Sequence, residues 1–377
     1  MFSIPFNRAA VVGNEKKYMV EALLSGRVMG NGDYTRRSET LLGRLTGAKH
    51  ALLTTSCTSA LEMAALLAGF KPGEEVIVPS FAFVSTANAF VIHGARPVFA
   101  DIRPDTLNMD EKVVEAHITE HTRAIVPLHY GGVACEMHTL SKIAQRHNLL
   151  LIEDNAHGLS GAYNNRALGT LGQMAALSFH ETKNYTCGEG GALLINDERF
   201  HARAEILREK GTNRQAFFRG EVDKYSWVDL GSSYVLSDIL AAMLLAQLEC
   251  FDLVFEKRRR VWEHYQASLA PWAENQSVQM PVVPAHCRQA YHLFYLLMPS
   301  EACRDRFIAH MREHGIHAVF HYLPLHLSKM GRYFGGREGD CPVTEELSVR
   351  LVRLPLYYGL REEEQRHIVE TVIDFTC

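Results

Sequence analysis

The sequence predicts an α/β protein in which a mostly parallel central sheet forms a large domain, followed by a small C-terminal α+β domain. Short apolar runs alternate with helical stretches through the first half of the chain, which is the pattern of a parallel sheet covered on both faces. A chain of 377 residues is also long for a single core. Near residue 271 the chain becomes polar and proline-bearing, and short mixed elements follow. We therefore place the large domain at 1–250 and the small domain at 251–377.

The composition is that of an ordinary globular protein. Lys and Arg total 39 against 43 Asp and Glu, the net charge is -4, and 47% of the residues are hydrophobic. This balance calls for neither a nucleic acid nor a membrane as partner. Because the start lacks the pattern of a signal peptide and no apolar run is long enough for a membrane span, we expect a cytoplasmic protein. Eight cysteines without a CxxC pair favour free thiols in a reducing compartment over zinc or disulfides.

The first elements are helical, and then the first strand begins. Apolar spacing over 14–48 predicts helices that are broken by the turn GNGD. ALLTTS from residue 51 then predicts a strand, and CTSALEMAALLAGF after it predicts a helix. Its first turn carries Cys57 and Thr58 among small residues, and free N–H groups at such a start bind anions. The alternative is an ordinary helix cap without a ligand.

The next elements alternate strand and helix. KPGEEVIVPS predicts a strand between turns, a helix follows to about Gly94, and strands at ARPVFADI and RAIVPLHYGG flank a helix at 110–118. Phe81 and Phe83 stand at the carboxyl end of the first of these strands. One of them can stack on a planar cofactor, whereas we expect the other to anchor the core. Tyr130 ends a later strand in the same crevice, and we take it as a candidate substrate contact.

A strand-end carboxylate follows the helix at 137–147. LLLIE at 149–153 predicts a buried strand, and Asp154 comes directly after it. Ligands of α/β sheets lie at the carboxyl ends of the strands, so Asp154 is placed to touch one. The alternative is that Asp154 caps the following helix.

The stretch AALSFHETKNYTCGEGGALLIN at 175–196 places Lys183 in a polar loop between two apolar strands. Partial burial favours a neutral lysine amine that can attack a carbonyl, although Lys183 can equally be a surface lysine on a hairpin. A loop lysine together with a strand-end carboxylate fits pyridoxal phosphate chemistry. The lysine bonds the cofactor, and the carboxylate keeps the ring nitrogen protonated.

The chain then leaves the sheet through a helix at about 200–210 and a long polar and aromatic stretch at 211–238, of the kind that contacts a partner. A helix from about Ser237 carries LAAMLLAQLECF and runs to KRRR at 257–260, which is a solvated helix face rather than a nucleic-acid patch.

Within the small domain, a polar, proline-bearing link at 271–284 precedes the mixed elements. AYHLFYLLM predicts a strand, RDRFIAHMREHG a helix, HAVFHYLPLH a second strand, and TEELSVRLVRL and EEEQRHIVETVIDF two further helices. The second strand carries Tyr322 and His326, which we take as candidate substrate contacts. Histidines cluster here, but Gly315 interrupts the helix and no acidic ligand is in register, so no metal site is predicted. The clustered residues are His310, His314, His317, His321 and His326.

Several long motifs resemble the DegT/DnrJ/EryC1/StrS family of sugar aminotransferases. They are TTSCTSALEMA, PGEEVIVPSFAFVSTANA, LIEDNAH, SFHETKN and GEGG, and the likeness extends from NRAAVVG to RLPLYYGL. The resemblance implies a fold type I pyridoxal phosphate-dependent aminotransferase that acts as a homodimer. Within the family, the chain most resembles the branch that makes dTDP-linked 4-amino-4,6-dideoxygalactose. The stretches that carry this resemblance are FHETKNYT, EKGTNR, FFRG with VDKY, and GSSY.

The resemblance also implies roles by position. Lys183 bonds the cofactor and moves a proton between the cofactor carbon and C4 of the sugar, and Asp154 and His157 contact the ring at its nitrogen and on its hydroxyl side. The stacking position falls on Phe83. Phosphate binding falls on Cys57 and Thr58, with Ser178 adding a hydroxyl and Ser233 reaching the phosphate of the partner subunit. Cys57 stands where glycine is commoner, and Ser233 where many relatives have Asn.

The implied reaction has two halves. L-glutamate aminates the cofactor, and the amine then passes to a nucleotide-linked 4-keto-6-deoxyhexose. Two alternatives stay open: a 3-keto sugar aminotransferase of the same family, and a noncatalytic sensor of the same fold. The related sugar dehydratases usually carry His at the lysine position, so Lys183 disfavours that class.

Overall fold

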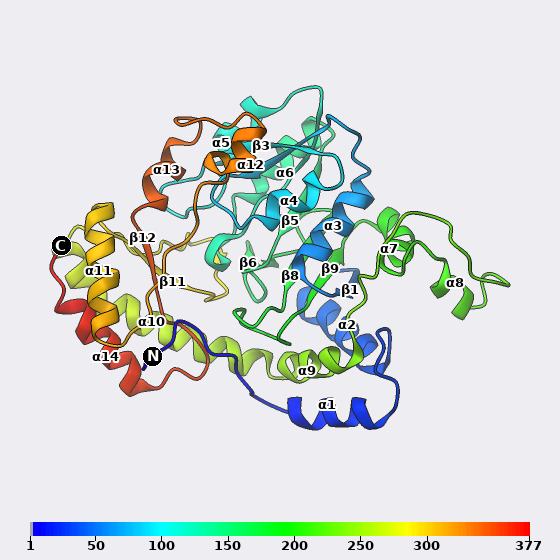
Figure 1. The fold of residues 1–377 in the computed structure, drawn as a ribbon, viewed down its shortest axis with the longest axis horizontal. Coiled ribbons are helices and arrows are strands. Elements are labelled where there is room, and N and C mark those ends of the chain that lie inside the picture. Colours follow the sequence, from blue (N-terminus) through cyan, green and yellow to red (C-terminus); the bar gives the residue numbers. More distant parts are fainter. Residues whose placement is uncertain (1–2) are drawn as a thin grey trace.

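The computed structural model describes residues 3–377, and a seven-stranded sheet lies at its centre (Figure 1). The strand order is β1-β9-β8-β5-β4-β2-β3, and only β9 runs antiparallel to its neighbours. The predicted α/β class with a mostly parallel sheet is therefore confirmed. The strands are β1 (His50–Thr54), β2 (Glu75–Pro79), β3 (Arg96–Ala100), β4 (Thr122–Ile125), β5 (Leu150–Asp154), β8 (Met174–Ser178) and β9 (Gly191–Ile195).

Successive residues of these strands enter cores on opposite faces of the sheet. Leu193 packs in the cluster under α3, whereas Leu194 packs in the cluster under α2 and α9. Burial on both faces explains why the strands have continuous apolar sequences. The helices around the sheet are α1 (Glu15–Leu24), α2 (Asp33–Thr46), α3 (Cys57–Ala68), α4 (Ser85–Val91), α5 (Glu111–Val114), α6 (Met137–Arg146), α7 (His201–Arg208), α8 (Arg214–Phe218) and α9 (Asp238–Glu249), with short 3-10 turns η1 (Glu115–His117), η2 (Tyr130–Gly132) and η3 (Glu198–Phe200).

The carboxylate of Glu153 ties the end of β5 to the loop that precedes β8. Both of its oxygens are buried and accept the N–H groups of Gly169, Leu171 and Gly172 at 2.6–2.8 Å, and Oε2 also lies 2.9 Å from His129 Nε2. Since Asp154 is the next residue, this network fixes the point where the sheet meets the cavity described below.

Replacing Glu153 by glutamine should destabilise the fold, because the amide keeps the size of the side chain but offers only one acceptor oxygen to donors that stay buried. We expect a loss of about 2–4 kcal/mol in the free energy of unfolding, measured by urea denaturation. The matched control is Glu120→Gln at an exposed position, which should leave the midpoint in place. Equal midpoints for the two variants would contradict the role of Glu153.

The small domain holds a two-stranded antiparallel sheet beside a long helix. Helices α11 and α14 lie at the left of Figure 1, beside the C-terminus. The elements are α10 (Phe251–Asn275), β11 (Phe294–Leu297), α11 (Glu301–Glu313), η4 (Leu325–Leu327), α12 (Lys329–Tyr333), α13 (Pro342–Ser348), β12 (Leu351–Leu354) and α14 (Glu362–Ile373), and a three-stranded sheet joins β10 (Cys287–Arg288), β6 (Ala162–Tyr163) and β7 (Arg166–Ala167). No helix within residues 3–377 is long and apolar enough to cross a membrane.

Four sequence predictions for the C-terminal region are wrong. The helix from Ser237 is two helices that break at Cys250, and the link begins later than predicted because Pro271 lies inside α10. Residues 317–326 form one isolated bridge, at Val319, rather than a strand, and the partner of β11 is β12, which was predicted as helix. The buried cluster of the small domain collects residues from Val261 onward together with Ile4. The division at 250/251 stays a prediction.

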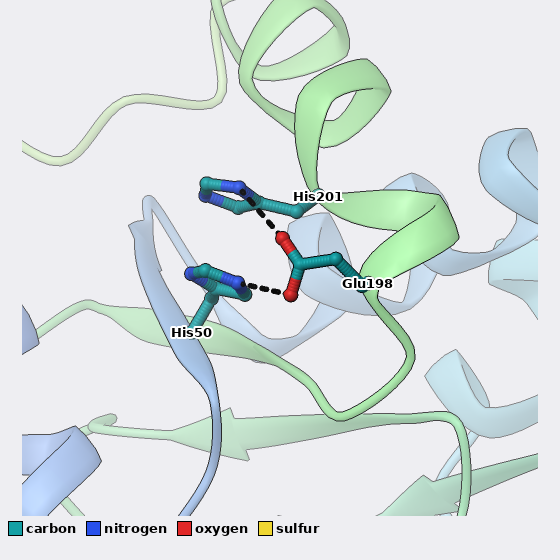
Figure 2. A group of neighbouring side chains, drawn as sticks. All are labelled: His50, Glu198 and His201. Atoms are coloured by element: carbon teal, nitrogen blue, oxygen red, sulfur yellow. Dashed lines mark hydrogen bonds and ion pairs between the residues drawn. The ribbon is translucent and has the colours of Figure 1, made fainter.

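A group of three metal-ligating side chains lies at the β1 edge of the sheet (Figure 2). Glu198 Oε2 is 2.9 Å from His50 Nε2, and Glu198 Oε1 is 3.9 Å from His201 Nδ1. The two imidazoles stack with centroids 3.6 Å apart and planes 8° apart. A metal binds imidazole nitrogen in the plane of the ring, and two stacked parallel planes do not share such a point. We therefore describe the group as two stacked imidazoles that lie beside one carboxylate.

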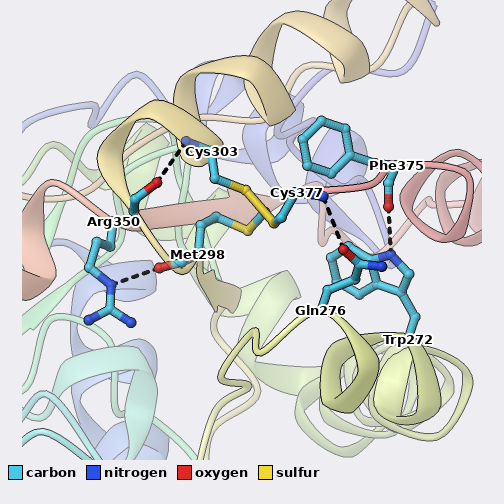
Figure 3. Close-up of a disulfide and its surroundings, with 8 residues drawn as sticks. Trp272, Gln276, Met298, Cys303, Arg350, Phe375 and Cys377 are labelled. Carbon is cyan, nitrogen blue, oxygen red and sulfur yellow. Dashed lines mark hydrogen bonds between the residues drawn. A yellow bond between two sulfur atoms is a disulfide. The ribbon is translucent and has the colours of Figure 1, made fainter.

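A disulfide between Cys303 and Cys377 corrects the prediction that every cysteine is free (Figure 3). It joins α11 to the chain end, 74 positions away, and the Cα atoms are 5.4 Å apart. The same end is held to α10, since Cys377 N donates to Gln276 Oε1 at 3.0 Å and Trp272 Nε1 donates to Phe375 O at 2.9 Å. The other six cysteines are free.

Candidate active site

A cavity of about 720 Å³ opens where the carboxyl ends of β5 and β8 meet the N-terminus of α3 and the small domain. The small domain closes one side with residues 319–323 and Arg353. Most of the site residues expected from the sequence line this one space, although they come from five separate parts of the chain. They are Cys57, Thr58, Phe83, Asp154, His157, Ser178, Lys183 and Tyr322.

The carboxylate of Asp154 faces the cavity from the end of β5 and is held in place. Oδ2 accepts the hydroxyl of Thr86 at 2.7 Å, and Oδ1 accepts the N–H of Ala156 at 3.2 Å. Burial raises the pKa of Asp154, and the two hydrogen bonds and the amine of Lys183 oppose that rise. A buried carboxylate with so few donors is suited to pair with a positive group of a ligand.

The amine of Lys183 lies in the same cavity, on the loop after β8. Burial lowers its pKa from 10.5 to about 8, and the charge of Arg353 also lowers it, while Cys57 and Asp154 raise it. The sequence alternative of an exposed hairpin lysine is therefore wrong. With this pKa about a tenth of the amine is neutral at pH 7, far more than for an exposed lysine, and attack on a carbonyl requires the neutral form.

This pKa shift predicts how cofactor-free protein responds to pH. Uptake of pyridoxal phosphate should speed up as pH rises and level off above about pH 8, because only the neutral amine attacks. The cofactor-free fold should also gain stability between about pH 8 and 10.5, where the unfolded chain binds a proton that the folded chain lacks. The uptake rate is followed by visible absorbance, and a rate that still rises steeply above about pH 9 would contradict the lowered pKa.

The N-terminus of α3 offers backbone donors to an anion. Ser56 caps the N–H of Ser59 at 3.0 Å, which leaves the first-turn N–H groups of Cys57 and Thr58 for a ligand. Gly191 packs so closely here that a Cβ would lie 2.3 Å from the carbonyl carbon of Ser56. Burial raises the pKa of the Cys57 thiol well above its usual range, so this residue contributes a backbone donor and not a thiolate.

Two aromatic positions behave as the sequence suggested. Phe81 is 1% exposed and belongs to the core, whereas Phe83 is 57% exposed and lines the cavity. His157 lies deeper, with Nδ1 accepting the N–H of Gly131 at 3.3 Å and Nε2 3.4 Å from the hydroxyl of Tyr322. Burial lowers the pKa of His157 well below its usual range, so the ring is neutral.

Three expected residues lie outside the cavity lining. Tyr130 is buried behind it, with its hydroxyl 3.1 Å from His321 Nδ1. Ser233 is exposed on the 211–238 segment and takes no part in this chain's own cavity. The choice of His326 as a substrate contact is wrong, because it is fully buried with Nδ1 2.5 Å from Ser80 Oγ and Nε2 2.9 Å from a carboxylate oxygen of Glu345.

Sequence reasoning missed several residues of the cavity wall, among them Arg353, Thr86 and Phe6. Thr86 is the third residue of the segment VSTANA, but nothing in that pattern shows that its hydroxyl donates a hydrogen bond to Asp154. Arg353 is the first residue of RLPLYYGL, which is part of the family resemblance, and this was the available signal.

The side chains present fit pyridoxal phosphate. A buried amine, a buried carboxylate and an exposed aromatic face share one cavity with a free helix N-terminus, and these match a carbonyl, a ring nitrogen, a flat ring and a phosphate respectively. Lys183 and Asp154 would hold the cofactor at its carbonyl carbon and ring nitrogen.

The chain matches a known protein family over nearly its whole length. A family model described as the DegT/DnrJ/EryC1/StrS aminotransferase family matches residues 11–373. The spore coat polysaccharide biosynthesis protein SpsC of Bacillus subtilis strain 168 is 32% identical over 98% of this chain and 96% of its own.

Solved structures are similar over the whole length. A Streptococcus pneumoniae protein described as a sugar aminotransferase, in its PMP form, is 25% identical with a TM-score of 0.92 and covers 98% of both chains. The same protein is solved in PLP and apo forms. The Helicobacter pylori aminotransferase PseC, involved in the biosynthesis of pseudoaminic acid, is 27% identical with a TM-score of 0.90 and covers 99% of this chain and 98% of its own.

Proposed function

Because this chain belongs to the DegT/DnrJ/EryC1/StrS aminotransferase family and is a pyridoxal phosphate-dependent sugar aminotransferase, we propose that it aminates a nucleotide-linked 4-keto-6-deoxyhexose. The proposed substrate is dTDP-4-keto-6-deoxyglucose, the donor is L-glutamate, and the product is the 4-amino-4,6-dideoxy sugar of galacto configuration. The motifs FHETKNYT and GSSY support this choice within the family.

One observation carries the proposal: the amine of Lys183 and the carboxylate of Asp154 face a single cavity, each buried and each within electrostatic reach of the other. A volume of about 720 Å³ holds a sugar in addition to a flat cofactor. When bound, pyridoxal phosphate supplies an electron-withdrawing ring that stabilises negative charge on the carbon that carries the transferred amine.

The residues of this chain would divide the work between binding and proton transfer. Asp154 keeps a proton on the ring nitrogen by its negative charge, and Thr86 orients that carboxylate. Lys183 Nζ takes the proton from the donor carbon in one half of the reaction and delivers a proton to C4 of the sugar in the other. Phe83 covers a face of the ring, and the small-domain segment 319–323 limits the access of water.

We propose that the enzyme works as a homodimer in the cytoplasm. Several large apolar side chains of the 211–238 segment are exposed, and Ser233 lies among them, which supports a role of that segment against the partner subunit's site. The name of SpsC, a spore coat polysaccharide biosynthesis protein, supports a place in the synthesis of surface polysaccharides.

The experiment incubates holoenzyme with L-glutamate and a panel of nucleotide-linked 3-keto and 4-keto sugars, and identifies the product by NMR. We expect an amine at C4 with the galacto configuration from the dTDP-linked 4-keto sugar. An amine at C3 would favour the 3-keto sugar alternative. A protein that binds the cofactor and turns over none of these sugars would favour the noncatalytic sensor.

A further inference from the structure

A second histidine, His292, packs against the ring of His157 in the cavity. The two imidazoles stack with centroids 4.3 Å apart and planes 25° apart. His292 comes from the segment before β11, is 9% exposed and lines the same cavity. Its Nδ1 lies 3.0 Å from Oδ1 of Asn184, the residue that follows Lys183. His292 therefore joins the ring of His157 to the loop that carries the lysine.

Hydrogen bonds close a circuit around this contact. Asn184 Nδ2 donates to Ala290 O at 2.6 Å, and Ala290 N donates to Gly132 O at 3.0 Å. Gly131, the neighbour of Gly132, donates its N–H to His157 Nδ1 at 3.3 Å. All of these residues are buried. A buried polar network whose members are bonded to one another favours a single arrangement of its side chains.

The hydrogen bonds define which ring nitrogens carry protons. Burial lowers the pKa of His157 and of His292 well below their usual range, so both rings are neutral. Because His157 Nδ1 accepts the N–H of Gly131, the proton of that ring is on Nε2, 3.4 Å from the hydroxyl of Tyr322. Because the Asn184 amide donates to a carbonyl, its oxygen accepts, and His292 carries its own proton on Nδ1.

The buried Arg258 of α10 holds the backbone of His292. Its Nε donates to Tyr291 O at 2.9 Å and its Nη2 to His292 O at 2.5 Å. Beyond burial, the groups that lower the pKa of His292 are His157, Lys183, Arg258 and His321. No acid is among them, so nothing favours a second proton on this ring. His292 is therefore a fixed neutral ring and not a carrier of protons.

We propose that Asn184 and His292 are positioning residues that hold His157 with its Nε2–H directed at the hydroxyl side of the cofactor ring. The inference rests on the proposed function and, within it, on a bound ring whose hydroxyl side faces His157. An N–H donor at that side stabilises negative charge on the ring oxygen. Because Asn184 is bonded to Lys183 along the chain, the same network keeps this donor and the attacking amine in register.

The test follows the visible absorbance of the cofactor-bound protein over pH, without any substrate. His157→Phe should raise the pH midpoint of the absorbance change by about 0.5–1 unit, because the ring oxygen loses its N–H donor and becomes more basic. His292→Ala should shift the midpoint in the same direction by at least about half as much, and His292→Phe, which keeps a ring against His157, should shift it less. In protein that already carries His157→Phe, His292→Ala should cause no further shift, because a positioning residue acts only through the residue that it positions.

Imidazole nitrogen NMR of the cofactor-free protein supplies a second readout. His157, identified by the signal that is lost in His157→Phe, should be protonated on Nε2 alone in the wild type. In His292→Ala it should show both neutral forms. The matched control is His286→Ala, since His286 lies in the same segment but pairs with Glu136 at 3.0 Å outside the cavity, and neither readout should change.

An unchanged midpoint in His292→Ala, or the same shift with and without His157, would overturn the proposal, as would a wild-type His157 protonated on Nδ1. If His292→Ala does not fold, His292→Asn replaces it in every comparison, because it keeps a donor for Asn184 and loses the stacked ring. An unchanged midpoint in His157→Phe would overturn the assumed orientation of the cofactor and the proposal with it. Failure to aminate any sugar would count against the proposed function and leave this test intact, since no sugar is present.

Discussion

Replacing Lys183 by alanine should abolish turnover and remove the visible absorbance of the bound cofactor. Burial lowers the pKa of the Lys183 amine to about 8. No other lysine among the described residues lines the cavity, so no second amine can replace it as nucleophile and base. Loss of such a group reduces kcat by roughly 10³-fold or more. Turnover is measured by release of 2-oxoglutarate from glutamate in the presence of the keto sugar.

The control for Lys183 is Lys142→Ala on the exposed side of α6, which should leave both turnover and absorbance unchanged. Lys183→Arg keeps a positive charge but has no attacking amine at neutral pH, and it should be as inactive as the alanine variant. A Lys183→Ala protein with turnover within about tenfold of the wild type would end the assignment of this residue.

Replacing Asp154 by asparagine should leave the cofactor bound but slow both halves of the reaction. The variant keeps the size of the side chain and removes the charge that holds a proton on the ring nitrogen. Loss of one such electrostatic contact costs about 10²- to 10³-fold in kcat. Single-turnover absorbance changes with glutamate and with the keto sugar measure the two halves separately.

Thr86→Val is the matched comparison for Asp154. It removes the hydroxyl that donates to Oδ2 at 2.7 Å and leaves the charge in place. We expect a smaller loss of about 10-fold in kcat, since the carboxylate loses one hydrogen bond from a neutral hydroxyl but keeps its charge. Equal rates for Asp154→Asn and wild type would show that the carboxylate does not act on the ring.

The sheet was predictable because buried parallel strands leave uninterrupted apolar runs. EVIVP in β2 and LLIED in β5 are covered on both faces and are bounded by turn residues. The small domain was harder. HAVFHYLPLH has strand-like sequence, yet only Val319 forms a bridge there, with Arg353, because the segment bends along the cavity. Local periodicity does not show which of two segments pairs with β11.

The candidate site was predictable where its residues follow strands in continuous motifs. Lys183 and Asp154 lie in such motifs at neighbouring strand ends, and β5 pairs directly with β8. Arg353 was missed, although it lies in a quoted motif, because only the fold brings β12 to the cavity that Lys183 lines. The bond between Cys303 and Cys377 likewise joins distant positions that carry no local signal.

Borohydride reduction of the purified holoenzyme, followed by peptide mass spectrometry, locates the residue that bonds the cofactor. Reduction fixes the bond between amine and cofactor carbon, so the label stays on the peptide. We predict a single labelled peptide that contains Lys183, and no label in Lys183→Ala. A label on another lysine, or a fully active enzyme that carries no label at Lys183, would contradict the arrangement of amine and carboxylate around one ring.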